Sequence, residues 1–517
     1  MSSVQTTKMT NWRWVMCAML FFATTVNYMD RQVLSLTFKE FIQPEFHWTD
    51  SDYGTITGVF SIAYAIFCLF AGKFVDWMGT KKGYLWAIIV WSLGAVMHAA
   101  CGWVAVQFIP EVADTATLKE IGETISATVA GLGEDTTAAA KEAAIASAIA
   151  KFNVTSQTLL AISSISVWLF LACRMVLGLG EAGNFPAAIK VTAEYFPKKD
   201  RAFATSIFNA GASVGALAAP ATIPLLAKSL GWEMAFIIIG VLGFFWAGIW
   251  IFVYDKPAKS KHVNEAELLY VNQDDENNNA EASEVKEKPM SFAKAFTYKQ
   301  TWSFAFGKFM TDGVWWFFLF WAPAYFQDQF HHKASDPMGI ALIFTLYAIV
   351  TVLSLFGGYL PKIFVEKLGM NPYAGRMRAM LIFAFFPVLA LFAQPLGDYF
   401  HSAWWPAIII GLVGAGHQAW SANIFSTTGD MFPKSAVATI TGIGAMAGGI
   451  GSFLINKGSG VLFDYAAGQG EAFQFMGFSG KPAGYMIVFC ICAVAYLIGW
   501  SVMKMLVPKY KPVIVED

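Results

Sequence analysis

The chain alternates between long apolar runs and shorter polar connections. A helix that crosses the hydrocarbon core of a membrane needs roughly 20 predominantly apolar residues. Scanned for runs of that length, the sequence predicts about twelve spans, six in each half of the chain. In the first half they are residues 12–35, 53–75, 83–104, 160–195, 202–227 and 233–254; in the second half they are 301–327, 338–365, 377–396, 403–429, 436–463 and 484–507. The fourth run is long, and we expect a bend near Pro186.

One polar segment divides these spans six and six. Residues 255–300 carry mixed charges and an Asn-rich stretch, a composition that cannot bury a core of its own. We therefore predict a six-helix lobe at 1–254, a cytoplasmic linker at 255–300 and a second six-helix lobe at 301–517. Within the linker, a short helix is expected at 265–271.

A second polar segment, residues 105–158, separates the third and fourth spans. Apolar residues recur there at helical spacing (Leu118, Ile121, Ile125, Val129), and an Ala-rich stretch follows at 138–150. The pattern predicts two short amphipathic helices that form an extracytoplasmic cap on the first lobe.

The basic residues are distributed unequally between the two sides of the predicted bundle. One set of connections holds most of them: Lys81, Lys82, Lys198, Lys199, Arg201, Lys367, Arg376, Arg378, Lys434, Lys509 and Lys511. Cytoplasmic loops are the ones enriched in Lys and Arg, so this asymmetry places both termini in the cytoplasm. The first apolar run continues into polar residues with no small-residue cleavage site, and we interpret it as a retained span.

The composition supports a membrane protein and excludes several other classes. The chain is 56% hydrophobic and 14% charged, whereas soluble domains carry about 25% charged residues. A net charge of −1 without a basic stripe gives no reason to expect a nucleic-acid partner. The six cysteines lie in apolar runs without metal-ligand spacing, and the motifs of membrane-embedded hydrolases and metalloproteases are missing from the sequence. A non-transporting sensor would need a soluble output domain, which the sequence lacks.

Charged residues inside the first and fourth spans are the strongest candidates for chemistry. The first span contains Asn27, Tyr28, Asp30 and Arg31; Asp30 can exchange a proton, and Arg31 can hold a carboxylate in bidentate geometry. A pair near the membrane interface that reaches water is the alternative interpretation.

The fourth span contains a second pair of charges. Arg174 and Glu181 are seven residues apart, so they lie on one helix face about 10 Å apart along the axis. Gly178 and Gly180 between them allow another helix to approach closely. Glu181 is either a proton-coupling carboxylate that responds to Arg174 and the substrate or part of a structural ion-pair network.

The connection after the second span carries a further motif. Gly72 and Gly79 permit a tight turn and close helix contact, and Asp76 between them is placed to pair with the positive end of a neighbouring helix. Lys81 and Lys82 follow, and by themselves they satisfy only the charge asymmetry of the loops.

Polar and aromatic side chains in the second half suggest a cavity wall. In the tenth span His417, Gln418, Trp420 and Asn423 interrupt an apolar run with hydrogen-bonding groups of the kind that sugar hydroxyls need. Other candidates are single residues of the second, fifth and seventh spans: Tyr64, Asn209, Asp312, Trp315 and Trp316. Packing is the alternative role for each of them.

These motifs resemble those of a known family. Gly72, Asp76 and Gly79 followed by Lys81 and Lys82 resemble the loop motif of the major facilitator superfamily, and Arg174, Gly178 and Gly180 resemble its span-four motif. More narrowly, four stretches resemble the anion:cation symporter family, hexuronate transporters above all: 27–31, 174–186, 234–240, and 414–419 with 430–432. The resemblance covers nearly the whole chain apart from 105–158 and part of the linker.

The resemblance implies an all-α major facilitator fold of two six-helix lobes around a central site. It implies that Asp30 and Glu181 are protonation sites, that Arg174 is the partner of Glu181, and that Tyr28, Arg31 and Tyr64 line the substrate cavity. It also implies that Asp76 is a cytoplasmic gate residue, although the family's usual Arg after that Asp is Trp77 here. The family loop is short where this chain has 105–158, so nothing is carried over onto that segment.

The resemblance therefore implies a proton-coupled importer of a hexuronate-type sugar acid that works by alternating access. A symporter for another organic anion, such as an aldonate, aldarate or aromatic carboxylate, is the alternative. The expected partners of the protein are a small organic anion and the lipid bilayer of the bacterial inner membrane, and protons are the expected coupling ion. We expect no metal, no other cofactor and no nucleic acid, and a carrier that acts as a monomer.

Overall fold

The computed structural model describes residues 8–132, 138–273, 290–354 and 356–513, and these fold almost entirely into helices. The first half contains α1 (Trp12–Thr37), a π-helical turn (Phe38–Ile42), α2 (Gln43–Phe46), α3 (Asp50–Met78), α4 (Thr80–Ala99), α5 (Cys101–Val106), α6 (Thr115–Ala130), α7 (Ala138–Ile149), a 3-10 turn (Ala150–Phe152), α8 (Ser156–Glu181), α9 (Asn184–Tyr195), α10 (Lys198–Leu230) and α11 (Trp232–Val253). The linker contains a 3-10 turn (Pro257–Lys259), α12 (Glu265–Val271) and α14 (Phe292–Ala295).

The second half repeats the pattern of long helices. It contains α15 (Lys299–Phe330), α16 (Pro337–Ser354), α17 (Phe356–Leu368), α18 (Pro372–Ala384), a 3-10 turn (Pro387–Leu389), α19 (Ala390–Tyr399), α20 (Trp404–Met431), α21 (Lys434–Gln469), a 3-10 turn (Gly470–Ala472) and α22 (Lys481–Leu506). A two-stranded antiparallel hairpin, β1 (Gln474–Phe475) and β2 (Phe478–Ser479), precedes α22 with Gln474 opposite Ser479.

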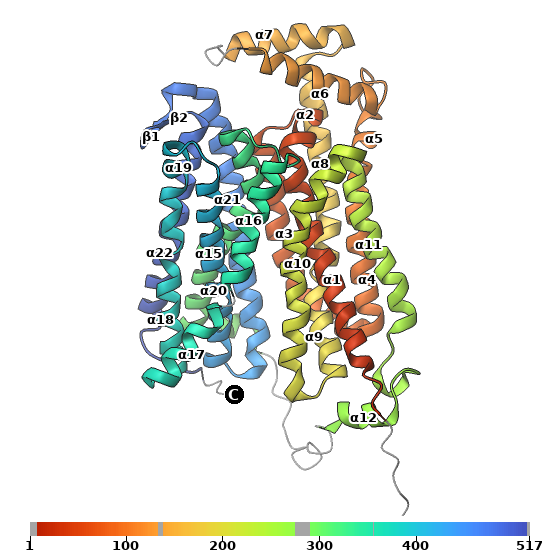
Figure 1. The fold of residues 1–517 in the computed structure, drawn as a ribbon, viewed down its shortest axis with the longest axis vertical. Coiled ribbons are helices and arrows are strands. Elements are labelled where there is room, and N and C mark those ends of the chain that lie inside the picture. Colours follow the sequence, from red (N-terminus) through yellow and green to blue (C-terminus); the bar gives the residue numbers. More distant parts are fainter. Residues whose placement is uncertain (1–7, 133–137, 274–289, 355, 514–517) are drawn as a thin grey trace, which may run out of the picture.

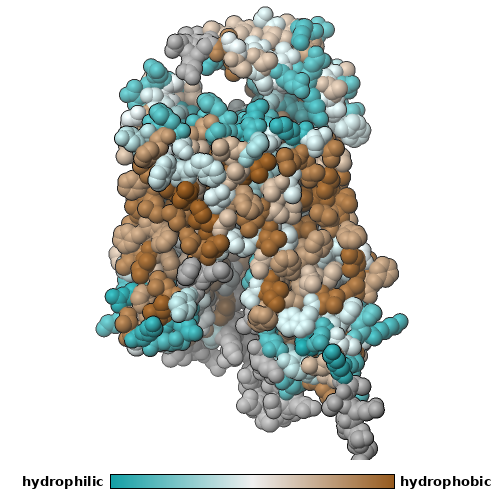
Figure 2. Space-filling view, in the orientation of Figure 1, coloured by the Kyte–Doolittle hydropathy of each residue, from teal (hydrophilic) through white to brown (hydrophobic). Residues whose placement is uncertain are grey.

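The helices of the two halves form two bundles that stand side by side (Figure 1). We call α1 to α11 the N-lobe and α15 to α22 the C-lobe. The linker helix α12 lies at one end of the bundles, the linker end, and α6 and α7 lie at the opposite end, the cap end. A broad apolar band covers the middle of the visible face, with hydrophilic residues toward both ends (Figure 2). This distribution is the one a bilayer selects.

Eight helical stretches in the described part of the chain are long and apolar enough to cross a membrane. They are Asp50–Met78, Ser156–Tyr195, Phe203–Leu230, Trp232–Val253, Pro337–Leu368, Pro372–Tyr399, Thr439–Ala472 and Lys481–Leu506. Four more long helices, α1, α4, α15 and α20, run in the same bundles but are interrupted by polar or charged residues. The shortest of them, α4, has 20 residues, and at about 1.5 Å per residue this length matches the hydrocarbon core.

The bend predicted near Pro186 in the fourth span is confirmed. The helix breaks between α8, which ends at Glu181, and α9, which begins at Asn184, so Pro186 falls in the first turn of α9. A proline is tolerated there because the amide it lacks would have no intrahelical acceptor. The bend therefore comes directly after the buried carboxylate of Glu181.

The cap predicted between the third and fourth spans is confirmed as two helices, α6 and α7. On α6, Leu118, Ile121 and Ile125 are buried, while Val129 is exposed. The backbone of α6 comes so close to α2 that a Cβ at Gly122 would lie 2.6 Å from the Pro44 carbonyl oxygen. The predicted linker helix is also confirmed, as α12, whereas the end of the Asn-rich stretch lies outside the described residues.

Candidate functional site

The four charged residues expected to carry the chemistry all lie inside the N-lobe. Helix α1 supplies Asp30 and Arg31, and α8 supplies Arg174 and Glu181. Their exposed fractions are 0%, 8%, 2% and 0%, respectively. Charged side chains are costly inside a membrane protein unless they have partners or a function. Both helices present these residues to the interior, so the alternative of a pair that reaches water at the interface does not hold.

An ion pair joins the two helices: Arg31 Nε donates to Glu181 Oε2 at 2.8 Å. This corrects the expected pairing of Glu181 with Arg174. Arg174 is seven residues from Glu181, about 10 Å along the axis of α8, and its two terminal nitrogens have no hydrogen-bond partner among the described residues. The Arg174 guanidinium instead lies 5.3 Å from the centre of the Phe60 ring on α3. The pairing thus depends on the neighbouring helix and not on spacing along α8.

Three aromatic rings surround the Arg31 guanidinium. Its Cζ lies 4.5 Å from the ring centre of Tyr64, 5.3 Å from that of Tyr28 and 5.9 Å from that of Trp316. Aromatic faces attract a cation within about 6 Å. Tyr28 and Tyr64 belong to the N-lobe and Trp316 to the C-lobe, so Arg31 lies where the two lobes meet.

Several buried polar atoms around this pair have no hydrogen-bond partner among the described residues. They are Asn27 Oδ1 and Nδ2, Asp30 Oδ1 and Oδ2, Arg31 Nη2, Arg174 Nη1 and Nη2, and Glu181 Oε1. Buried polar groups are nearly always hydrogen-bonded in folded proteins. Most of these unpaired atoms belong to the two carboxylates and the two guanidinium groups. Carboxylate oxygens can accept protons, and guanidinium nitrogens can donate hydrogen bonds to an anion or to water.

The close helix approach predicted at Gly180 is confirmed, and it positions Glu181. A Cβ at Gly180 would lie 2.2 Å from the backbone nitrogen of Trp91 on α4. Gly178 faces a side chain instead, with the Phe60 ring 3.3 Å from its hypothetical Cβ. The contact at Gly180 holds the end of α8 against α4 and fixes where the next residue, Glu181, emerges.

In the C-lobe the polar residues predicted on α20 mostly contact their own lobe. His417 Nδ1 lies 2.5 Å from the Tyr496 hydroxyl, and the His417 ring stacks on Trp315 at 5.4 Å. Trp420 packs edge-on against Tyr496, and the Asn423 amide donates to the carbonyls of Gly357 and Ala419.

The remaining C-lobe and fifth-span candidates lie apart from the Arg31 site. Trp315 stacks on His417, whereas its neighbour Trp316 is the tryptophan that lies beside Arg31, so substrate binding by Trp315 stays a prediction. Gln418 is half-buried on α20, and Asn209 is exposed on α10. The structure therefore brings Tyr28, Tyr64 and Trp316 to Arg31, and it does not bring Asn209 or the α20 residues into contact with it.

The loop motif after α3 forms a turn with its own ion pairs. Gly79 has a φ of 77° between α3 and α4, a conformation that favours glycine. Asp76 Oδ1 pairs with Lys190 Nζ at 2.7 Å, and Lys81 Nζ pairs with Asp255 at 2.9 Å.

One part of the prediction for this loop differs from the structure. A Cβ at Gly72 would meet no atom within 4 Å, so the close helix contact expected there is missing. The close approach occurs at Gly83 instead, whose hypothetical Cβ would lie 3.0 Å from Val75 Cα. Lys82 is exposed, as its place in a charged loop predicts. The gating role of this loop stays a prediction.

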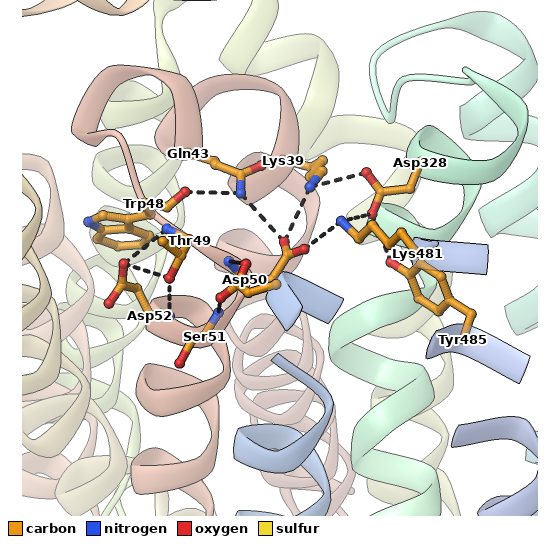
Figure 3. Close-up of polar contacts among 11 residues, drawn as sticks. Lys39, Gln43, Trp48, Thr49, Asp50, Ser51, Asp52, Asp328, Lys481 and Tyr485 are labelled. Carbon is orange, nitrogen blue, oxygen red and sulfur yellow. Dashed lines mark hydrogen bonds and ion pairs between the residues drawn. The ribbon is translucent and has the colours of Figure 1, made fainter. Parts of the chain in front are cut away.

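Four charges at the cap end join the two lobes, and the sequence analysis missed them (Figure 3). Lys39 Nζ lies 3.2 Å from Asp50 Oδ1 and 3.1 Å from Asp328 Oδ1. Lys481 Nζ lies 2.5 Å from Asp50 Oδ2 and 2.5 Å from Asp328 Oδ2. Lys39 and Asp50 belong to the N-lobe and Asp328 and Lys481 to the C-lobe, so each cation bridges both lobes. We call these four residues the cap-end network.

Further contacts at the cap end strengthen the connection between the lobes. The Asp464 carboxylate of α21 accepts hydrogen bonds from the backbone amides of Asp50 and Ser51, at the beginning of α3. Lys457 donates to the hydroxyls of Ser51 and Thr55. Among the described residues, the three ion pairs between the two lobes, Lys39–Asp328, Lys228–Asp336 and Lys481–Asp50, all lie at this end. The structure is therefore closed at the cap end.

A second buried ion pair was also missed, although its spacing was visible in the sequence. Lys308 and Asp312 are four residues apart on α15, and their Nζ and Oδ2 atoms lie 2.7 Å apart. Only Asp312 was considered, beside the two tryptophans that follow it. An opposite-charge pair at this spacing inside a predicted span is a signal that sequence alone could have supplied.

A helical membrane protein of two bundles, with buried charges and aromatic residues where the bundles meet, has the architecture of a membrane transporter. The model of the Major Facilitator Superfamily matches residues 20–151 and 143–455, and the chain belongs to that family. It is a transporter and not an enzyme.

Similar proteins include several transporters of sugar acids. The hexuronate transporter of Escherichia coli K12 is 25% identical over 496 residues, which cover 95% of this chain and 94% of that protein. The galacturonate transporter of Dickeya chrysanthemi is 24% identical over 74% of this chain and 92% of its own length. A probable galactarate/D-glucarate transporter of Escherichia coli K12 is 23% identical over 93% of this chain and 94% of its own length.

Solved structures share the fold. A bacterial homologue of the human lysosomal transporter Spinster, in an inward-facing and unoccupied conformation, matches with a TM-score of 0.62 at 17% identity, over 96% of this chain and 97% of that one. A D-xylose–proton symporter matches with a TM-score of 0.60 at 14% identity, over 97% of this chain and 98% of that one.

Proposed function

We propose that this protein is a secondary active transporter that imports a hexuronate-type sugar acid together with protons by alternating access. The observation that carries the proposal is the buried Arg31–Glu181 ion pair, 2.8 Å long and surrounded by aromatic rings where the lobes meet. The names of the similar hexuronate and galacturonate transporters support the substrate class. The bacterial inner membrane, with both termini in the cytoplasm, is the location that this function and the loop charges favour.

Substrate and proton are coupled in this proposal because they compete at Arg31. A guanidinium binds carboxylates in bidentate geometry, and Glu181 occupies that role in the structure. Protonation of Glu181 removes its charge and frees Arg31 for the carboxylate of the sugar acid. When the substrate leaves, Glu181 loses its proton and returns to Arg31. One proton bound and one carboxylate bound thus keep the buried charge balanced.

Asp30 and Arg174 form the second half of this charge balance. Asp30 is completely buried and lies within electrostatic range of Arg31, Arg174 and Glu181. Both of its carboxylate oxygens are unpaired among the described residues, so it is a second place for a proton. Arg174 offers two unpaired nitrogens to whichever carboxylate is ionised. In the proposed cycle Asp30 and Glu181 take up protons from the outside and release them to the cytoplasm.

The cap-end network provides the outer gate of the cycle. With the cap end outside, the four-charge contact closes the outer entrance, and it must break before substrate and protons can enter. The Asp76 loop lies at the linker end and acts as the inner gate. Substrate drives the change only by binding the occluded form better than the open forms.

Replacement of Glu181 by Gln tests the proposal, because glutamine keeps the shape of the side chain and removes its titration. In proteoliposomes with an imposed proton gradient, Glu181→Gln should abolish accumulation of labelled glucuronate while exchange of substrate across the membrane persists. Glu120→Gln, on the exposed side of α6, is the matched control and should accumulate substrate like the unaltered protein. Undiminished proton-driven accumulation by Glu181→Gln would contradict the assigned role.

The substrate class is tested separately. Uronates, aldonates, aldarates and aromatic carboxylates should be compared as competitors of labelled glucuronate uptake in the unaltered protein. Strong competition by uronates alone supports a hexuronate carrier. Stronger competition by another class would establish the alternative, a symporter for another organic anion, and would leave the proton-coupling assignments intact.

A further inference from the structure

The Lys308–Asp312 pair on α15 has no part in the proton-coupling scheme, yet it is buried. The side chains are 6% and 14% exposed, and Nζ and Oδ2 lie 2.7 Å apart. Asp312 also differs from the carboxylates of the cap-end network, because Lys308 is its single ionic partner among the described residues. By contrast, Asp50 and Asp328 each contact two lysines. Asp312 thus shares its charge with one lysine, whereas each carboxylate of the cap-end network shares its charge with two.

The pair lies on the side of α15 that faces neighbouring helices. A Cβ at Gly448 of α21 would lie 2.2 Å from Asp312 Oδ2, and Lys308 Nζ lies 4.3 Å from the ring centre of Phe425 on α20. The residue after Gly448 meets the N-lobe, since a Cβ at Gly449 would lie 2.5 Å from Ala65 Cβ on α3. Adjacent residues of α21 thus contact Asp312 on one side and the N-lobe on the other.

Trp316 connects this pair to the Arg31 site. Residues four apart on a helix lie on the same face, about 6 Å apart along the axis, so Asp312 is one turn from Trp316. The Trp316 ring centre lies 5.9 Å from Arg31 Cζ and 6.1 Å from the ring centre of Tyr64. If a sugar acid binds by its carboxylate at Arg31 and places its ring over Trp316, the next polar side chains one turn along α15 are those of Asp312 and Lys308.

The chemistry of the pair suits hydroxyl groups and opposes a second carboxylate. An ionised Asp offers two acceptor oxygens and Lys offers three donors, a combination that binds neighbouring hydroxyls. Asp312 also neutralises Lys308, so this end of the site presents no net positive charge. A carboxylate that approached Asp312 would meet a like charge in a poorly hydrated place, where repulsion is stronger than in water. Such a repulsive group is a common device for rejecting a competing substrate.

We propose that Lys308 and Asp312 are specificity-determining residues that bind the hydroxyl end of a monocarboxylate sugar acid and exclude aldarates, which carry a carboxylate at both ends. This inference rests on the proposed function and deepens it, because it chooses between substrate classes. Asp312 acts as the excluding group, and Lys308 holds it in place and donates to the sugar.

Variants of opposite charge test the proposal, with glucuronate and glucarate as the probes. The measurement is the ratio of the apparent affinities for the two acids, from competition against labelled glucuronate in proteoliposomes. Asp312→Asn leaves the Lys308 charge unbalanced and should shift the ratio toward glucarate by about tenfold. Lys308→Gln leaves the Asp312 charge unbalanced and should shift it toward glucuronate. Lys308→Arg keeps the charge and should keep the ratio.

The opposite directions distinguish a charge effect from damaged folding, which would lower both affinities in both variants. Glu120→Gln and Lys151→Gln, which break an exposed pair in the cap insertion, are the matched controls and should leave the ratio unchanged. A ratio that is the same in Asp312→Asn, Lys308→Gln and the unaltered protein overturns the proposal while glucuronate transport stands. An unaltered protein that prefers glucarate to glucuronate also overturns it. Failure of the unaltered protein to transport any sugar acid refutes the proposed function itself, and this inference with it.

Discussion

Replacement of Lys481 by Gln should open the cap end of the protein. Lys481 Nζ lies 2.5 Å from a carboxylate oxygen of Asp50 in the N-lobe and 2.5 Å from one of Asp328 in the C-lobe. Without this cation, the two carboxylates share Lys39 alone, and their mutual repulsion is less compensated. The conformation in which the cap end is open loses nothing, because water solvates the separated charges there. The substitution therefore weakens the closed conformation selectively.

The size of the effect follows from the burial of the network. Its four side chains are between 5% and 17% exposed. Removal of one partner from a buried ion pair costs roughly 3–5 kcal/mol, and the residual exposure together with the remaining Lys39 favours the lower value. A change of about 3 kcal/mol shifts the equilibrium between closed and open forms by roughly 150-fold. Alternative conformations usually differ by a few kcal/mol, so the open form should become a major species.

Distance measurement between spin labels at the cap end checks this prediction. Leu230 in the N-lobe and Met338 in the C-lobe are 56% and 41% exposed, and each can be replaced by a labelled cysteine after the native cysteines are removed. Pulsed electron paramagnetic resonance should show a short distance in the unaltered protein and an added longer one in Lys481→Gln. Lys481→Arg should restore the short distance, and Lys151→Gln, which alters an exposed pair within the cap insertion, should not change it.

A distance distribution in Lys481→Gln identical to that of the unaltered protein would refute the reasoning. It would mean that the remaining contacts at the cap end, such as Asp464 with the first amides of α3, hold the lobes together without the cation.

Two further predictions concern the cap and the helix packing. Burial raises the pKa of Glu45 from its usual 4.5 to about 7, against a lowering contribution from the hydrogen bond that Trp232 donates. Because the pKa of Glu45 is raised in the folded state, the stabilisation from packing the neutral side chain is present at acid pH and lost as pH rises through 7. The total loss in the free energy of unfolding is at most about 3 kcal/mol. Hydrogen exchange of the α6 amides, corrected for the intrinsic exchange rate, should therefore be faster at pH 8 than at pH 6. Glu45→Gln should remove the difference. Equal protection of α6 at both pH values in the unaltered protein would contradict the prediction. Gly180→Ala should destabilise the protein by about 1–3 kcal/mol, because the added Cβ would lie 2.2 Å from the Trp91 backbone nitrogen. Gly72→Ala, where the added Cβ meets no atom within 4 Å, is the control and should be neutral in a thermal-unfolding assay. Similar melting temperatures for the two variants would show that α8 relaxes freely.

Much of the fold was predictable because a bilayer imposes a simple rule on sequence. The first predicted span, 12–35, corresponds to α1 at Trp12–Thr37, and the linker helix predicted at 265–271 is α12. Apolar length and helical periodicity are local properties, and both can be counted along the chain. The bend near Pro186 was predictable too, because a proline marks a helix boundary or a kink, and here it lies in the first turn of α9.

The candidate site was predictable only in part, for the same reason. Asp30, Arg31, Arg174 and Glu181 were identified because charges inside apolar runs are conspicuous, and all four lie in the N-lobe interior. Their partners were not identified correctly. Spacing along α8 suggested that Arg174 serves Glu181, but the nearer guanidinium is that of Arg31 on another helix.

The amino-acid sequence alone determined which segments span the membrane, which charges are placed inside it, and the family to which the chain belongs. Tertiary structure alone decided the pairing of Arg31 with Glu181, the choice of Trp316 over Trp315 at Arg31, and the existence of the cap-end network. Lys39 and Lys481 are distant in sequence, yet they contact the same two carboxylates. Hydrophobicity is a property of a segment and can be summed along it, whereas an ion pair depends on a distance of a few Å between atoms that only the packed helices bring together.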